Sequence, residues 1–304
     1  MRADVYQKIT DQIVTALEQG VTPWQQPWHV EHGTGRITRP LRANGTPYQG
    51  INVLMLWSAA IEKGYRAPIW MTFRQARELN AHVRKGEQGT IVVYADKIIR
   101  TKTDPRSGED TERAIPFMKG YVVFNIEQID GLPEHYCGKP RTPPNSVERI
   151  AHAERFLDAT GAKVVHGGNK ACYVVSTDSI HLPCIEFFRD AESYYATRAH
   201  ETVHWTRHES RLNRDFGRKR FGDEGYAMEE LVAELGAAFL CADLALTSEV
   251  REDHAAYVSS WIKLLKNDRR AIFAAASHAQ RAADFLHGLQ LSSFTMAGAT
   301  DVAG

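Results

Sequence analysis

The stretch "AHETVHW", Ala199–Trp205, decides the fold of the second half of this chain, because it sets His200 and His204 four residues apart. On an α-helix, residues at this spacing lie on one face with their Cβ atoms about 5–6 Å apart, so two imidazoles can share one Zn²⁺. Glu201 lies one step round the helix and can take a proton from an attacking water and deliver it to a leaving amine. The pattern is H-E-x-x-H, which is typical of zinc peptidases. The alternative is a polar helix that happens to be rich in histidine.

A zinc peptidase site of this kind needs a third protein ligand, and in gluzincins it is a glutamate on the next helix. The stretch "EELVAELGAAFL" begins at Glu229 and carries three carboxylates among apolar residues. Carboxylates in such a helix are costly unless they are paired or bind a metal. We assign Glu230 as the third ligand and Glu234 as the acceptor of a proton from a ligand histidine. Glu229 is the main rival for the ligand role, and the alternative for it is an exposed helix residue.

The residues around the motif predict a helical domain with a small sheet. A helix is expected from about Ala191, and His208 is expected at the surface or beside a ligand rather than on the metal. Upstream, "VVSTDSIHLP" at 174–183 is typical of an edge strand that binds an extended substrate by β-addition. Further helices are expected at 226–244 and, broken near Asn267–Asp268, at 254–289.

The proline-rich stretch "YCGKPRTPPNS" predicts a linker at 136–146 between two domains. The expected division is therefore a first domain at 1–135, a second domain at 147–290 and a flexible tail at 291–304. The first domain should begin with an amphipathic helix that ends at Gly20. Helices at 52–65 and 72–83 and strands at 89–103 and 117–129 follow, with a polar loop at 104–115 between the strands. These elements make the fold class α+β.

The charge of the first domain is concentrated in one span. From Arg36 to Lys102 there are 12 Lys and Arg residues and 4 Asp and Glu residues, so this span carries +8 and the rest of the neutral chain carries −8. Aromatic residues are interleaved with these Lys and Arg residues. Proteins that bind single-stranded nucleic acid use aromatic rings to stack on the nucleobases and cations to contact the phosphates. The alternative is a solvated charged face with aromatic residues in the core. The expected DNA-binding residues are Trp24, Trp28, Arg39, Arg42, Tyr48, Arg74, Arg84 and Lys85.

The remaining composition is that of an ordinary soluble protein, with 43% hydrophobic and 24% charged residues in 304. The four cysteines form no C-x-x-C pair and are expected to be reduced and mostly buried. No apolar run reaches membrane-spanning length, so no membrane partner is expected. These observations predict a cytoplasmic protein.

Taken together, four stretches resemble the ArdC-type antirestriction proteins of conjugative plasmids: "DVYQKITDQIVTALEQGVTPWQQPW", "WMTFRQARELNAHVRKGEQGT", "YYATRAHETVHWTRHESRLNR" and "YAMEELVAELGAAFL". The N-terminal part also resembles the leading region of TraC-type primases. The resemblance implies a single-stranded-DNA-binding domain followed by a mainly helical zincin-like metallopeptidase domain. It further implies protection of incoming plasmid DNA from type I restriction. The gluzincin pattern often has Asp or Asn where this chain has Glu234.

Two hypotheses follow. In the first, the chain binds single-stranded DNA and cleaves a restriction-enzyme subunit or another DNA-bound protein with one divalent ion, zinc in the first place and manganese or cobalt as alternatives. In the second, the chain coats DNA or assists a primase without proteolysis, and its metal site is structural or regulatory.

Overall fold

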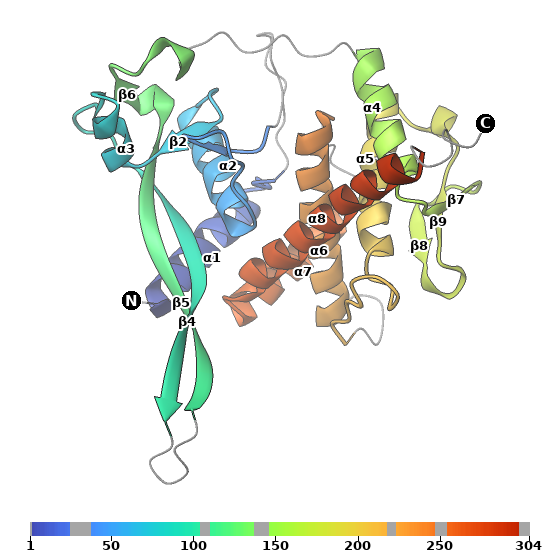
Figure 1. Cartoon of the computed structure of the whole chain (residues 1–304). Coiled ribbons are helices and arrows are strands. Elements are labelled where there is room, and N and C mark those ends of the chain that lie inside the picture. Colours follow the sequence, from blue (N-terminus) through green and yellow to red (C-terminus); the bar gives the residue numbers. More distant parts are fainter. Residues whose placement is uncertain are drawn as a thin grey trace. The chain divides into compact units, whose positions relative to one another are not determined.

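The computed structural model describes residues 2–24, 38–103, 110–136, 146–217, 223–246 and 254–297 (Figure 1). The chain forms two compact units, and each is discontinuous in sequence. Unit 1 comprises Met1–Ile9, Pro40–Pro47 and Met55–Gly138, and unit 2 comprises Thr10–Arg39, Tyr48–Leu54 and Lys139–Gly304. The α+β class is confirmed, with most of the sheet in unit 1 and most of the helix in unit 2. None of the described helices is long and apolar enough to cross a lipid bilayer.

Unit 1 is built on a four-stranded sheet in the order β1-β2-β5-β4. Strand β1 (Leu41–Arg42) is parallel to β2 (Ile69–Met71), and the pairs β2–β5 and β5–β4 are antiparallel. A second pair joins β3 (His82–Val83) to β6 (Ile129–Asp130). A small core of Met71, Ala76, Ala81 and Ile129 lies between these elements.

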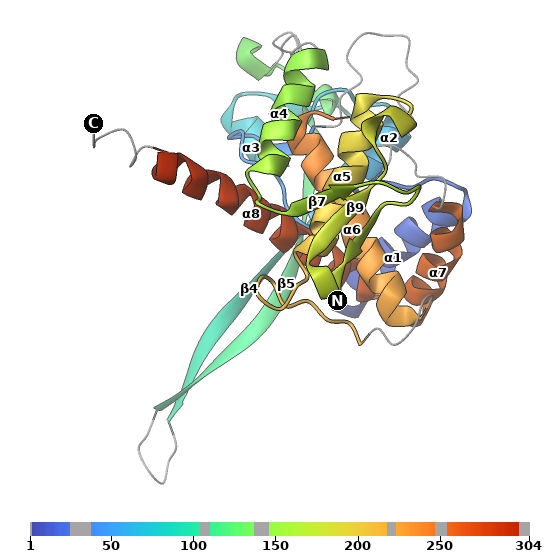
Figure 2. The same cartoon turned by 90° about the vertical axis from the view of Figure 1, so that its right-hand side faces the viewer.

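The strands β4 (Thr90–Thr103) and β5 (Asp110–Asn125) form a long two-stranded ribbon, visible in Figures 1 and 2. Their register runs from Thr90↔Val123 to Thr103↔Asp110. The predicted loop at 104–115 is therefore wrong in its second half, because 110–115 pair with β4 as strand. Residues 104–109 lie outside the described part of the chain. The polar composition of 110–115 concealed a strand whose stability comes from its ladder hydrogen bonds.

Helix α3 (Phe73–Glu78) begins where the sequence predicts, at a Thr72 cap, and ends earlier. Thr72 accepts from the backbone N–H of Gln75, whose side chain in turn accepts from the N–H of Thr72, so the capping box is complete. The helix stops because Asn80 has a left-handed φ of 58°, after which the chain enters β3. The predicted helix at 72–83 is wrong beyond residue 78. Helix α2 (Ile51–Lys63) is confirmed within two residues.

The helices at the two ends of the chain agree with the prediction except at the C-terminal limit of the last helix. Helix α1 (Arg2–Glu18) buries Ile9, Ile13 and Leu17 and is followed by Gly20 with φ of 74°, as predicted. Helix α7 (His254–Asn267) is separated from α8 (Ala271–Ala297) at the expected break. The predicted flexible tail at 291–304 stays a prediction: α8 extends to Ala297, and 298–304 lie outside the described residues.

Unit 2 combines helices with a three-stranded sheet in the order β7-β9-β8. Strand β9 (Ser179–Leu182) lies at the centre, parallel to β7 (Lys163–His166) and antiparallel to β8 (Cys172–Val174). Figure 2 shows this sheet lying over the helices that follow it. The prediction of an edge strand at 174–183 is therefore wrong about its position in the sheet. Residues 179–182 of this stretch form β9, which is the central strand. Strands β7 and β8 form the two edges of this sheet, and an edge strand can accept an extended chain.

Three successive helices of unit 2 pack against one another. Helix α4 (Ser146–Asp158) follows the predicted linker, of which residues 137–145 lie outside the described part. Helix α5 (Ala191–Trp205) begins at the cap Asp190, whose carboxylate accepts from the N–H of Ser193. Helix α6 (Glu224–Leu244) is apolar on nearly every face and buried among α5, α7 and α8. A helix of that composition is stable only inside a core.

Gly236 sets how closely α6 approaches α5. A Cβ at this position would lie 2.9 Å from both Cγ atoms of Val203, whereas a Cβ at Gly288 of α8 would meet nothing within 4 Å. Replacing either glycine by alanine should add about 0.5–1 kcal/mol of helix stability. At Gly236, overpacking of about 1–3 kcal/mol should outweigh this gain. We therefore expect thermal unfolding to show a higher Tm for Gly288→Ala and a lower Tm for Gly236→Ala. Equal stabilisation by both changes would contradict the close approach of the two helices.

Candidate metal centre

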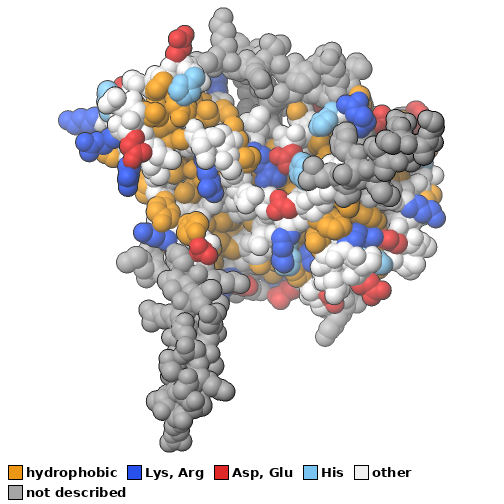
Figure 3. Space-filling model, in the orientation of Figure 1, with side chains coloured by type: hydrophobic (Ala, Val, Ile, Leu, Met, Phe, Trp, Pro, Cys, Tyr) orange, Lys and Arg blue, Asp and Glu red, His pale blue; other side chains and the backbone are white. Residues whose placement is uncertain are grey.

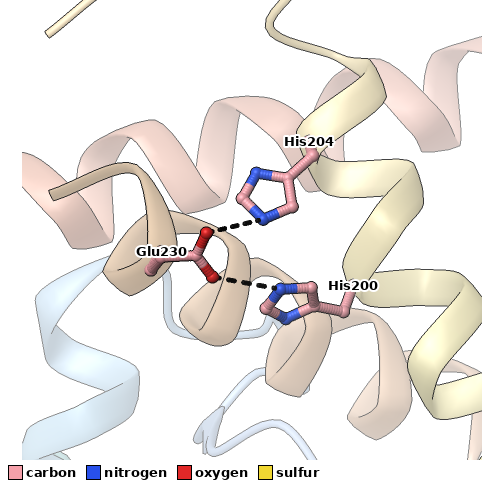
Figure 4. A group of neighbouring side chains, drawn as sticks. All are labelled: His200, His204 and Glu230. Carbon is pink, nitrogen blue, oxygen red and sulfur yellow. Dashed lines mark ion pairs between the residues drawn. The ribbon is translucent and has the colours of Figure 1, made fainter. Parts of the chain in front are cut away.

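His200, His204 and Glu230 come together in the core of unit 2, two from α5 and one from α6 (Figure 4). The Nε2 atom of His200 lies 3.6 Å from one Glu230 oxygen, and the Nε2 atom of His204 lies 3.6 Å from the other. One ligand atom from each residue lies within 4.8 Å of the other two. Within the described residues this is the one such group of three or more. Both imidazoles thus point the same ring nitrogen toward one carboxylate, which leaves a position that all three groups share.

The second ring nitrogen of each histidine meets another carboxylate of α6. His200 Nδ1 lies 3.3 Å from Glu234 Oε1, and His204 Nδ1 lies 3.0 Å from Glu229 Oε1. Histidines that bind metals ordinarily donate their other N–H to such a group, which fixes the ring orientation. Sequence reasoning placed Glu234 in this role and kept Glu229 as a rival ligand. The structure instead sets Glu229 behind His204, on the side away from Glu230.

The donor set fits a divalent cation. Glu201, Glu230 and Glu234 are all at most 9% exposed, and a cluster of buried carboxylates is costly without positive charge. Burial would raise the pKa of the Glu230 carboxyl, but the charges and hydrogen bonds of His204 and His200 hold it well below its usual range. Burial would lower the pKa of His204, whereas the charge of Glu230 and the hydrogen bond to Glu229 raise it to about 10. The site therefore attracts positive charge, and two imidazoles with one carboxylate are a zinc-type set.

Glu201 lies on α5, directly after His200 in sequence. Its side chain is buried, at 3% exposed. Burial raises the pKa of the Cys172 thiol, and the negative charge of Glu201 raises it further. Cys172 begins strand β8, which packs against α5, so the charge of Glu201 acts on that end of the strand.

Tyr226 stands one helical turn before Glu230 on α6. Its hydroxyl lies 2.8 Å from the hydroxyl of Tyr257. Burial raises the pKa of Tyr226, as do a hydrogen bond to Tyr257 and the charge of Glu230. The Tyr226 hydroxyl is therefore a neutral group beside the carboxylate that the histidines face.

His208 is not part of the cluster, as the sequence predicts. Helix α5 ends at Trp205, and the following turn directs the His208 ring to Ser210, 2.8 Å from Nδ1 to Oγ. Among the three described cysteines, Cys172, Cys184 and Cys241, all are free, as expected. Only Cys241 is buried, so the expectation of mostly buried thiols is wrong.

Three of the predicted DNA-binding side chains are buried rather than exposed. Trp24 is 1% exposed and packs edge to face on Trp261 at 5.9 Å. Arg39 is 7% exposed and donates to both carboxylate oxygens of Asp243 at 3.0 Å. Tyr48 is 7% exposed. Because these three side chains are buried in unit 2, the structure does not favour their predicted contact with DNA.

The remaining predicted residues lie at the surface of unit 1, except Trp28, which is outside the described part. Arg42, Arg74, Arg84 and Lys85 are all exposed. Arg74 pairs with Glu78 at 2.8 Å, and Arg84 pairs with Glu87 at 2.8 Å. Figure 3 shows Lys and Arg side chains gathered at the margin of unit 1 that carries α3.

Sequence reasoning missed an aromatic surface on the ribbon. Tyr94 and Tyr121 are 48% and 41% exposed, and the pairs Val92↔Tyr121 and Tyr94↔Lys119 place both rings on one face. The Lys119 ammonium lies 5.1 Å from the centre of the Tyr121 ring. Alternation along 90–96 and 117–123 could have indicated this face, because residues two apart in a strand share one side.

Two family models match separate parts of the chain. Residues 3–124 match the N-terminal domain of the anti-restriction factor ArdC, and residues 151–278 match a zincin-like metallopeptidase. The DNA primase TraC of Escherichia coli is 40% identical over 92% of this chain, but the chain spans only 27% of that primase.

Relatives that match over their full length are also found. The uncharacterized protein y4eC of Sinorhizobium fredii is 44% identical, over 94% of this chain and 92% of its own length. The metal-free crystal structure of the antirestriction protein ArdC from the R388 plasmid has 45% identity and a TM-score of 0.79, covering 95% of this chain and 98% of that chain. Its Mn(II)-bound structure has 44% identity and a TM-score of 0.75, over 93% and 97%. The predicted resemblance is thus confirmed, and the chain belongs to the ArdC family of antirestriction proteins.

Proposed function

We propose that this chain binds single-stranded DNA through unit 1 and carries a divalent-metal peptidase site in unit 2, and that it protects incoming conjugative plasmid DNA from type I restriction. The observation that supports the peptidase most strongly is the convergence of His200 Nε2 and His204 Nε2 on the Glu230 carboxylate, at 3.6 Å each. The proposed place of action is the cytoplasm of the cell that receives the DNA.

His200, His204 and Glu230 would hold the ion, and Glu201 would be the general base. A divalent ion here supplies a Lewis acid that polarises a peptide carbonyl and activates water. Glu201 accepts a proton from the attacking water and then delivers it to the leaving amine. Glu234 and Glu229 hold the imidazoles in place through their Nδ1 atoms. We propose zinc as the ion, with manganese or cobalt as alternatives; the R388 relative has been solved with Mn(II).

The free edge of β8 is where an extended polypeptide would bind. Strand β8 pairs with β9 on one side only, so its other side can accept the backbone of a substrate. The negative charge of Glu201 acts on Cys172, the first residue of β8. The proposed substrate is therefore a protein segment in extended conformation, from a restriction-enzyme subunit or another DNA-bound protein.

Single-stranded DNA would bind the exposed Lys and Arg side chains of unit 1 through its phosphates. The rings of Tyr94 and Tyr121 would stack on its nucleobases. We expect a double variant, Arg74→Glu with Lys85→Glu, to weaken binding of a fluorescent oligothymidine by the full-length protein. The plot of log affinity against log salt has a negative slope, and each phosphate contact removed should reduce the magnitude of that slope by about 0.7. Fluorescence anisotropy at several salt concentrations measures both effects.

The matched control changes one arginine and one lysine in unit 2, Arg155→Glu with Lys163→Glu, which are also exposed. It alters the net charge of the chain equally. Equal loss of DNA affinity in both double variants would contradict a specific surface on unit 1 and indicate only a response to total charge.

A second function is favoured by the match to TraC primases. The chain could coat DNA or assist a primase, with the metal site in a structural or regulatory role. Conjugation of a plasmid into a host with type I restriction separates the two functions. If proteolysis protects the plasmid, Glu201→Gln should abolish protection while DNA binding persists. Full protection by this variant would favour the non-proteolytic function.

A further inference from the structure

We propose that Arg214 is a positioning residue for the metal centre: it holds Glu229, and Glu229 in turn holds the His204 ring. This inference rests on the proposed metal site, and it assigns a role to a residue outside the helices that carry the ligands. Arg214 lies in the segment between α5 and α6 and is 4% exposed.

The guanidinium of Arg214 grips the Glu229 carboxylate with two nitrogens. Nε donates to Oε2 at 2.8 Å and an Nη atom donates to Oε1 at 2.7 Å. This bidentate geometry fixes the plane of the carboxylate as well as its position. Both Glu229 oxygens thus accept hydrogen bonds from one guanidinium, so the carboxylate has a fixed orientation.

A carboxylate held in this way can only accept hydrogen bonds, so His204 must donate through Nδ1. The distance from Nδ1 to Glu229 Oε1 is 3.0 Å. With Nδ1 committed, the lone pair available for an ion lies on Nε2, the atom that faces Glu230. Arg214 therefore determines which nitrogen of His204 a metal meets, and in what direction.

Arg214 also fixes the end of α5 that carries His204. The same guanidinium donates to the carbonyl of Val203 at 3.1 Å and to the hydroxyl of Thr206 at 3.1 Å. These residues flank His204 on the last turn of the helix. One buried side chain thus joins α5, the segment after it and the α6 residue next to Glu230. Such a link presets the separation of the ligands before an ion arrives.

A neighbouring arginine provides a matched control. Arg211 lies in the same segment, donates to the carbonyl of Trp205 at 2.7 Å and pairs with Asp178. It therefore also ties the end of α5 to the rest of unit 2, and its guanidinium lies 3.8 Å from the Trp205 ring centre. Its side-chain hydrogen-bond partners are Asp178 and Tyr173, which hold none of the residues His200, His204 and Glu230. The two arginines differ in whether their partner reaches a ligand.

The test compares Arg214→Lys with Arg211→Lys in the full-length protein. Affinity for Mn²⁺ and Zn²⁺ is measured by calorimetry with chelator competition, and the visible absorption spectrum of bound Co²⁺ reports ligand geometry. Loss of an outer partner of a metal ligand ordinarily weakens metal affinity about 10–100-fold. We expect a loss of this size and a changed Co²⁺ spectrum for Arg214→Lys only. Unchanged affinity and spectrum in folded Arg214→Lys would overturn the proposal.

A second variant tests the same proposal if Arg214→Lys does not fold. In Arg214→Met with Glu229→Met, no buried charge is left unpaired, and such apolar replacement of a buried pair is often tolerated. His204 then lacks its acceptor, and we expect the same 10–100-fold loss of metal affinity. Affinity within about twofold of the wild type in this variant would also overturn the proposal. If the wild type itself binds no metal, the proposed metal site fails, which is a distinct result.

Discussion

Replacing Glu201 by glutamine is expected to lower peptide-bond hydrolysis by roughly 10²–10⁴-fold, because the amide cannot accept the proton of the attacking water. Glutamine has nearly the same shape, and Glu201 is not among the three clustered ligand residues. Metal affinity should therefore remain close to that of the wild type. Cleavage of a set of fluorogenic peptides measures the first effect, and calorimetric titration with Mn²⁺ or Zn²⁺ measures the second.

The control for this change is Glu209→Gln, an exposed glutamate a few residues beyond the end of α5. It makes the same chemical substitution away from the cluster and should leave hydrolysis unchanged. Wild-type rates for Glu201→Gln would exclude Glu201 as the general base.

Replacing His204 by alanine is expected to reduce metal affinity by more than roughly 10²-fold, because it removes one of three protein ligands. A ligand at 100 times its Kd stabilises a protein by about 2.7 kcal/mol. The rise in Tm that Mn²⁺ or Zn²⁺ causes in the wild type should therefore vanish in the variant, as differential scanning fluorimetry would show.

His208→Ala is the matched control for that loss, since His208 is four residues further on and binds Ser210 instead. Its metal-dependent rise in Tm should equal that of the wild type. Loss of the metal effect in His208→Ala, with the effect retained in His204→Ala, would mean that the ligands have been assigned incorrectly.

The parts of the site that could be predicted are those that share one helix or two adjacent helices. The spacing of His200, Glu201 and His204 depends only on helical geometry, and Glu230 stands out as a carboxylate in an apolar helix. Arg214 could not be found in this way. It contributes through a turn whose path depends on the left-handed φ of 44° at Asn213 and on packing against α6.

The placement of Trp24 and Arg39 was missed for a similar reason. Both stand in a basic, aromatic stretch that is typical of a nucleic-acid surface, yet both belong to unit 2, where Trp24 packs on Trp261 and Arg39 pairs with Asp243. These partners follow them by more than two hundred positions in sequence. Local composition carries no information about such distant partners, whereas it did indicate the cap at Thr72 and the break between α7 and α8.

Anomalous diffraction from crystals grown with Mn²⁺ or Zn²⁺ would test the proposed metal centre, because it locates the ion itself. We expect one strong peak in each chain, about 2.0–2.2 Å from the Nε2 atoms of His200 and His204 and from a carboxylate oxygen of Glu230. A peak held by other residues, or no peak between α5 and α6 at saturating metal, would contradict it.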